Sequence, residues 1–219
     1  MFAAWEAGVW KALRGRFQPD LIVGASAGAW NGWAIAGGCA PEDLIREWMD
    51  PRRARMTLRP KALHQMARDL FARYQPRVPF GLTVVEVPRL RARLVRDSEI
   101  TWRHLAATCA VPFLWPPVRI EGKFFVDGGL LGALPLWAAA EMGATRAIAA
   151  NALTTPALRA LHKILRPRAP GAALEVIRIE PSTHLGSMRE AVCWSRANIE
   201  RWIGQGERDA NRAATSITM

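Results

Sequence analysis

The chain has 219 residues, half of them hydrophobic, and carries a formal net charge of +11. That length is enough for one domain with a sizeable core. No apolar run reaches the ~18 residues of a membrane span, and the N-terminus lacks the basic start of a secretory signal. The three cysteines are widely spaced and odd in number, which excludes a disulfide framework and a cysteine metal site and indicates a reducing, cytoplasmic compartment.

Periodicity and turn residues predict helices and strands that alternate along the chain. The predicted helices cover residues 3–14, 27–36, a segment opening at Pro41, 61–74, 102–110, 134–144 and one long amphipathic stretch, 188–210. The predicted strands cover residues 21–23, 81–87, 122–129, 146–153 and 174–181. This alternation predicts an α/β fold with a mostly parallel central sheet and helices on both faces.

Residues 51–80 are expected to form a basic excursion on the outside of this domain. The basic residues of the segment are set against Asp69 alone; they are Arg52, Arg53, Arg55, Arg59, Lys61, Arg68, Arg73 and Arg77. Such a surface attracts anions, either nucleic acid or acidic lipid headgroups. The plainer alternative is a solvated basic face with no partner.

The stretch PDLIVGASAGAW runs from a short apolar strand through Gly-Ala-Ser-Ala-Gly into a helix. A serine at a sharp strand-to-helix turn holds its hydroxyl exposed and needs small neighbours, which Gly24, Ala27 and Gly28 provide. The free N–H groups of the helix, starting with that of Ala27, would stabilise an oxyanion. Ser26 is therefore a predicted nucleophile. The alternative is an ordinary glycine-rich turn in which Ser26 caps the helix.

A serine hydroxyl needs a base, and the residues leave two kinds of candidate open. In the order of the α/β-hydrolases the histidine follows the acid, which admits His162 or His184, and His184 is better placed in a loop after a strand. Asp127 ends an apolar strand before Gly128 and Gly129, so its carboxylate is positioned to enter a site. The alternative for Asp127 is a common Asp-Gly turn.

Three segments together resemble the patatin-like phospholipase family. WEAGVWKAL is similar to the helix before the family's nucleophile turn, and PDLIVGASAGAWNGWAIAGG is similar to the turn itself. ATCAVPFLWPPVRIEGKFFVDGGLLGALPLWAAAEMGA resembles its second signature, where a proline-rich turn precedes the Asp-Gly-Gly strand end. The likeness covers most of a single domain, 1–219, and is weakest over 51–80. It implies a three-layer α/β sandwich.

The resemblance also implies a mechanism, a serine–aspartate dyad without histidine. Ser26 would attack an ester carbonyl, and Asp127 would take the serine proton and later activate water. An acyl-enzyme would form on Ser26 and be hydrolysed in a second step. The implied activity is that of a lipid acyl hydrolase, a phospholipase or esterase, that uses no metal and no cofactor.

One departure from the family concerns its first strand and a glycine-rich loop, which precede the first helix and supply oxyanion N–H groups. Here Met1 lies at or just before that helix, which leaves the Ala27 N–H and the helix terminus as donors. Losing one oxyanion donor typically costs ~10²–10³ in kcat. The sheet is also expected to have a gap with unpaired edges. Either the natural protein is longer than this chain, or the chain is a truncated, weak or inactive relative.

The sequence leaves three functions open. The first is a lipid ester hydrolase, and the second is a catalytically weak or inactive protein of the same fold that binds lipid or another anionic partner. Nucleic-acid binding is the weaker third, because no reading motif accompanies the basic segment. Tryptophans crowd the N-terminal quarter, and any that are exposed beside arginines would suit peripheral contact with an anionic membrane; they are Trp5, Trp10, Trp30, Trp33 and Trp48.

Overall fold

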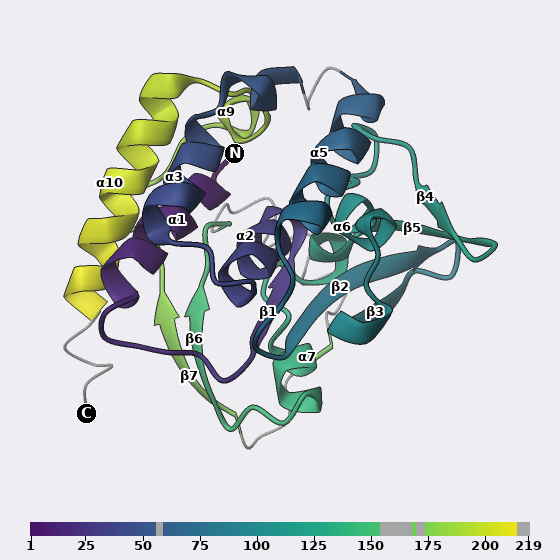
Figure 1. The fold of residues 1–219 in the computed structure, drawn as a ribbon, viewed down its shortest axis with the longest axis horizontal. Coiled ribbons are helices and arrows are strands. Elements are labelled where there is room, and N and C mark those ends of the chain that lie inside the picture. The colour runs from purple at the N-terminus through teal and green to yellow at the C-terminus, as the bar shows by residue number, and fades with distance from the viewer. Residues whose placement is uncertain (56–58, 154–167, 170–173, 214–219) are drawn as a thin grey trace.

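The computed structural model describes residues 1–55, 59–153, 168–169 and 174–213 (Figure 1). Its helices are α1 (Ala3–Leu13), α2 (Ser26–Ala36), α3 (Pro41–Met49), α5 (Pro60–Arg73), α6 (Trp102–Thr108), α7 (Leu136–Glu141), α9 (Met188–Val192) and α10 (Arg196–Ala213). Its strands are β1 (Ile22–Ala25), β2 (Phe80–Val87), β3 (Arg91–Arg96), β4 (Val118–Ile120), β5 (Lys123–Asp127), β6 (Arg146–Ala150) and β7 (Glu175–Ile179). Short 3-10 turns lie at Pro51–Arg53, Asp97–Glu99 and Gly128–Leu131.

The strands form two sheets. In the larger sheet β1 pairs with β2 in parallel, while β3 and β5 pair with β2, and β4 with β5, in antiparallel fashion. In the smaller sheet β6 and β7 pair in parallel. The two parallel pairs, β1–β2 and β6–β7, are each joined by a long stretch of chain. The antiparallel strands β3, β4 and β5 extend the larger sheet. Among the described residues, β1 has a strand partner on one edge only, and so has β6.

Helices cover both faces of the larger sheet, as two neighbouring residues of β2 show. Phe80 stacks edge-on against Trp33 of α2, and its ring lies where a side chain at Gly32 would be. On the opposite face Gly81 leaves room for Met142, just after α7; a Cβ there would lie 2.5 Å from the Met142 sulfur. Successive strand residues point to opposite faces. The predicted α/β class with a helical layer on each face is therefore confirmed.

The first and last described helices, α1 and α10, lie side by side (Figure 1). Their backbones approach closely because a glycine faces the partner helix on each side. A Cβ on Gly8 would lie 2.0 Å from the Ile203 carbonyl oxygen, and one on Gly206 would lie 2.0 Å from that of Trp5. Trp5 is fully buried here and donates its indole N–H to Asp209 at 2.9 Å. Among the described helices, none combines the length and apolar character needed to cross a bilayer.

Most predicted elements are present within a residue or two, including the helix expected over 61–74 inside the basic segment. The single long helix expected over 188–210 is wrong. It is two helices, α9 and α10, separated at Cys193, whose backbone is extended. Next to this break Trp194 donates its indole N–H to the Trp48 carbonyl at 3.0 Å. The strands β3 and β4 were not predicted. Arg91–Arg96 carries the arginines of an edge strand rather than an apolar run, and β4 has only three residues.

The condition set for the N-terminal tryptophans is not met, and one expectation about the basic face is corrected. None of the N-terminal tryptophans is exposed; each of Trp5, Trp10, Trp30, Trp33 and Trp48 is buried. Arg53, expected on the basic face, is also buried, with its guanidinium 4.3 Å from the Trp48 ring centroid and its Nε donating to the Glu47 carbonyl. The five N-terminal tryptophans therefore belong to the core, and Arg53 packs among them.

Candidate active site

The sheet brings Ser26 and Asp127 together although 101 positions separate them in the chain. Strand β1 runs parallel to β2 and ends where Ala25 is opposite Thr83. Strand β5 runs antiparallel to β2 and ends where Asp127 is opposite Val84. Since β3 occupies the other edge of β2, β1 and β5 share one edge and their carboxyl ends meet there. The residue after β1 and the last residue of β5 therefore become neighbours.

Ser26 occupies the first position of α2 in a left-handed backbone conformation, with φ of 55°. That conformation is uncommon for a residue other than glycine, and it is typical of a sharp functional turn. The hydroxyl does not cap the helix. It donates a hydrogen bond to Asp127 Oδ2 at 2.6 Å, and the N-terminal end of α2 lies directly behind it. The alternative of Ser26 as an ordinary N-cap does not describe this geometry.

The Asp127 carboxylate is buried at 4% exposure and is held from two sides. Ser26 donates to Oδ2, and the Gly129 N–H donates to Oδ1 at 2.7 Å. Burial raises the pKa of Asp127 from its ordinary 3.8 to about 7, against the opposing effect of these two hydrogen bonds. A carboxylate whose pKa lies near neutrality is suited to accept and return a proton at physiological pH.

Several glycines surround the Ser26–Asp127 pair. The space around each one shows whether a larger residue could replace it. A Cβ on Gly24 would lie 2.5 Å from the Ala29 Cα, and one on Gly128 would lie 2.1 Å from the Thr83 carbonyl oxygen. Both contacts are with backbone, so neither glycine can be replaced without moving the chain. At Gly28 a Cβ would meet only the Glu6 carboxylate at 3.3 Å. Gly28 and Ala27 belong to the first turn of α2, whose N–H groups lack intrahelical partners.

Thr108, at the end of α6, is a residue of the site that the sequence analysis missed. Its hydroxyl accepts a hydrogen bond from the Ser26 N–H at 2.9 Å and donates one to the Thr83 carbonyl at 2.8 Å. The side chain is fully buried. The only signal in the sequence was its place in the segment ATCAVP, which by itself assigns no role to a threonine. Thr108 thus ties the backbone of Ser26 to the strand beside it.

The hydrogen bonds of the Ser26 and Asp127 side chains involve none of the described histidines. His184 is exposed in the segment between β7 and α9, where its neighbours Thr183 and Leu185 accept hydrogen bonds from α10. His104 caps α6 through Thr101, and His64 packs on the Trp102 ring. His162 lies outside the described residues. The hydrogen bond of the Ser26 hydroxyl goes to Asp127 and not to an imidazole.

The Cys109 thiol lies near the Ser26–Asp127 pair. Burial, followed by the nearby Asp127 carboxylate, raises the pKa of Cys109 well above its ordinary value, so this thiol stays protonated. In the part of the chain that the structure describes, no group of three or more His, Cys, Asp or Glu side chains is arranged to hold a metal ion.

The fold and the site define an α/β protein with a serine at a strand-to-helix turn, hydrogen-bonded to the aspartate that ends a neighbouring strand. The family model described as patatin-like phospholipase matches residues 1–83 and 82–140. The match covers more than half of the chain, which therefore belongs to the patatin-like phospholipase family. No curated protein matches the sequence.

Among solved structures, the crystal structure of VipD from Legionella pneumophila is similar to this chain with a TM-score of 0.54 and 10% sequence identity. The superposition covers 98% of this chain and 65% of that one, so this chain spans slightly less than two thirds of the length of VipD. At that identity the likeness concerns the fold alone.

Proposed function

We propose that this protein is a serine lipid acyl hydrolase, a phospholipase or esterase that cleaves carboxylic ester bonds. The observation that carries the proposal is the 2.6 Å hydrogen bond from the Ser26 hydroxyl to the buried Asp127 carboxylate. Family membership adds the substrate class, because the family takes its name from phospholipase activity. The buried carboxylate with a pKa near 7 supplies the base that a serine nucleophile needs.

In the first step Ser26 Oγ attacks the ester carbonyl carbon while Asp127 accepts the Oγ proton. The tetrahedral intermediate expels the alcohol, which takes that proton from Asp127 and leaves an acyl group on Ser26. Water then gives a proton to Asp127 as its oxygen attacks the acyl carbon. Collapse releases the carboxylic acid, and Asp127 returns the proton to Ser26, so the enzyme ends as it began.

Negative charge on the carbonyl oxygen is stabilised by the N-terminal end of α2, through the N–H groups of Ala27 and Gly28 and the positive end of the helix dipole. The Ser26 N–H is not available for this task, because Thr108 already accepts its hydrogen bond. The two hydrogen bonds at Ser26 therefore have separate purposes: the hydroxyl serves the chemistry and the backbone N–H fixes the turn.

Hydrolysis of a chromogenic short-chain ester and of a phospholipid tests the proposal directly. Ser26→Ala and Asp127→Asn are each expected to lower kcat by about 10⁴-fold, because removal of either partner of a nucleophile–base pair disables both. His184→Ala is the matched control and should retain the wild-type rate. An inactive His184→Ala enzyme that still folds would favour a histidine triad and overturn the dyad.

The second candidate is a catalytically weak or inactive protein that binds lipid or another anionic partner on this fold. Strand β1 leads directly into Ser26, and among the described residues it has a strand partner on one edge only, which favours this second candidate. In either case the expected surface contact is with an anionic partner such as a membrane, because the exposed basic residues of 51–80 include Arg59 and Lys61 at the start of α5. Lipid binding by wild-type protein that is matched by Ser26→Ala, with no ester hydrolysis by either, would identify this second function.

A further inference from the structure

Among the described residues, five large hydrophobic side chains are exposed, and four of them belong to the same part of the larger sheet and the segments beside it. These four, which we call the apolar rim, are Leu90, Phe113, Leu114 and Phe124. Leu90 lies in the turn between β2 and β3, Phe124 lies in β5, and the other two lie between α6 and β4. Strand β2 pairs with β3 and β5, and β5 pairs with β4. One exposed hydrophobic residue is ordinary, whereas a group of them on neighbouring segments indicates a contact surface.

The apolar rim lies at the end of the sheet that holds the candidate active site. Strand β2 continues past the end of β1 to Val87, which is opposite Phe124 of β5. The β2–β3 and β4–β5 hairpins therefore project together beyond β1 (Figure 1). Phe124 precedes Asp127 by three residues, about 10 Å of strand. The other part of the rim is also close, because the Ala110 carbonyl accepts the Asp127 N–H at 3.0 Å and Phe113 follows within about 11 Å of chain.

Phe113 is held in a costly position by a well-formed turn. Its side chain is fully exposed, and its backbone has a φ of 69°, in the left-handed region that a bulky residue rarely adopts. The Val111 carbonyl accepts the N–H groups of Leu114 at 3.1 Å and of Trp115 at 3.0 Å, and the Trp115 side chain is buried. Backbone strain of this kind is typical of functional positions, and a fully exposed ring has no packing within the chain to offset it. A contact outside the chain would explain both features.

Basic side chains surround the apolar rim. Glu86, a carboxylate of the same strands, is buried and pairs with Arg89 and Arg93. Apolar side chains with arginine and lysine beside them suit the surface of an anionic bilayer. A protein partner fits less well, because lysine is depleted at protein–protein interfaces. The exposed basic residues of the two hairpins are Arg89, Arg91, Arg119 and Lys123, set against exposed Glu121.

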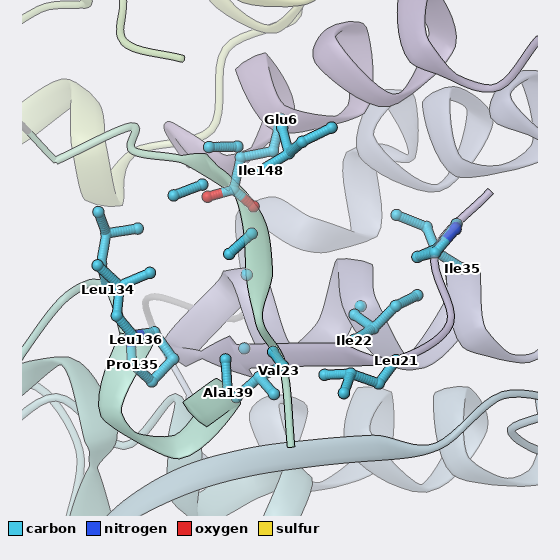
Figure 2. Close-up of a pocket in the computed structure, with 18 of the residues that line it drawn as sticks. Glu6, Leu21, Ile22, Val23, Ile35, Leu134, Pro135, Leu136, Ala139 and Ile148 are labelled. Atoms are coloured by element: carbon cyan, nitrogen blue, oxygen red, sulfur yellow. The ribbon is translucent and has the colours of Figure 1, made fainter. Parts of the chain in front are cut away.

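The apolar rim is separate from the cavity of about 510 Å³ that lies beside β1 and α2. Glu6, Val23 and Ile35 are on the boundary of that cavity (Figure 2). No residue of the apolar rim lines it. The rim therefore faces solvent rather than an internal space, and an apolar partner that covers it must approach from outside the molecule.

We propose that the apolar rim inserts into the surface of an anionic phospholipid bilayer and holds the active-site end of the sheet against it. Phe113 and Leu114 enter the boundary between headgroups and acyl chains, while the basic side chains of the hairpins stay among the headgroups. This adds an apolar component to the contact expected of the basic segment 51–80. Only the delivery of a lipid ester to Ser26 rests on the proposed hydrolase function; the docking itself does not.

The test is sedimentation with vesicles of equal parts phosphatidylcholine and phosphatidylglycerol, using the full chain with Ser26→Ala as the parent so that no lipid is consumed. Adding Phe113→Ser and Leu114→Ser is expected to weaken vesicle binding by about 10- to 100-fold, because two apolar side chains no longer leave water. The difference should persist at high salt, which screens exposed charges but not apolar burial. Met188→Ser is the control. It removes an exposed apolar side chain of α9, which lies apart from both hairpins (Figure 1), and should bind like the parent.

Thermal unfolding checks that the variants fold. Phe113→Gly, which removes the ring and suits the left-handed backbone, replaces the double change if that variant fails to fold. No binding by the parent, equal binding by the parent and the rim variant, or an equal loss in Met188→Ser would each overturn the proposal. Self-association of the chain through the rim without vesicle binding would overturn it as well. Because every arm carries Ser26→Ala, these outcomes are independent of whether the wild-type protein hydrolyses esters.

Discussion

Ser26 has an unfavourable backbone conformation, and both its backbone N–H and its hydroxyl donate hydrogen bonds. A non-glycine residue in the left-handed region costs roughly 1–2 kcal/mol. Here the cost is offset by the bond from its N–H to Thr108 and the bond from its hydroxyl to Asp127. The arrangement aims the hydroxyl at the carboxylate and away from its own helix. In the proposed mechanism, the position of the Ser26 hydroxyl therefore depends on a threonine that does not touch the reacting atoms.

Thr108→Val is expected to lower kcat by about 10- to 100-fold with little change in KM, because a nucleophile displaced by even 1 Å reacts much more slowly. Valine matches the shape of threonine but leaves the Ser26 N–H without its acceptor, at a cost to the unfolding free energy of about 1–3 kcal/mol. Steady-state kinetics and thermal unfolding measure both effects. Thr108→Ser keeps the hydroxyl and should restore kcat; equal losses in the serine and valine variants would refute a positioning role.

At the scale of elements, the site depends on two strands that end at the same point on the edge of β2. Gly128 follows the second of them and lies against the Thr83 carbonyl, where a Cβ would come within 2.1 Å. Gly128→Ala should therefore displace Asp127 from Ser26 and destabilise the fold together. Esterase assays and thermal unfolding of Gly128→Ala test this prediction, and both the activity and the Tm are expected to fall. The control Gly28→Ala, which meets only the flexible Glu6 side chain, should be much milder.

The sequence predicted these elements well where local signals were strong. Glycines and an apolar run marked β1 and α2, and Asp127 was identified at the end of its strand. The meeting of Ser26 and Asp127 was supplied by the family resemblance, since the residues alone left His184 open. Thr108 was missed because its role comes from contacts with two other segments, and no local pattern distinguishes it from any small helix residue.

The break between α9 and α10 was missed for a similar reason. The stretch remains amphipathic through the break, and the chain bends at Cys193, beside the hydrogen bond of Trp194 to the carbonyl of Trp48. A contact between residues 146 positions apart leaves no periodic signal. The same holds for Arg53, since its charge predicts the surface, whereas its burial depends on its contacts with the Trp48 ring and the Glu47 carbonyl.

At the scale of the whole molecule, the net charge of +11 governs long-range association. The N-terminal tryptophans are buried and cannot insert into lipid, so the electrostatic docking predicted here rests on the exposed basic residues. Vesicles with anionic lipid at low salt should bind the protein more tightly than neutral vesicles, and salt should weaken binding. The double variant Arg59→Glu/Lys61→Glu should bind less, whereas exposed Arg208→Glu on α10 should change little. Equal binding to both vesicle types would rule out this docking.

The most direct measurement of the Ser26–Asp127 pair is covalent labelling by a fluorophosphonate probe, followed by mapping of the adduct and its rate against pH. The adduct is expected on Ser26, with a rate that rises as pH increases through about 7, because Asp127 accepts the proton only when ionised. Asp127→Asn should abolish labelling at every pH while the fold persists. An adduct on another residue, or an Asp127→Asn protein that is labelled at the wild-type rate, would contradict the account.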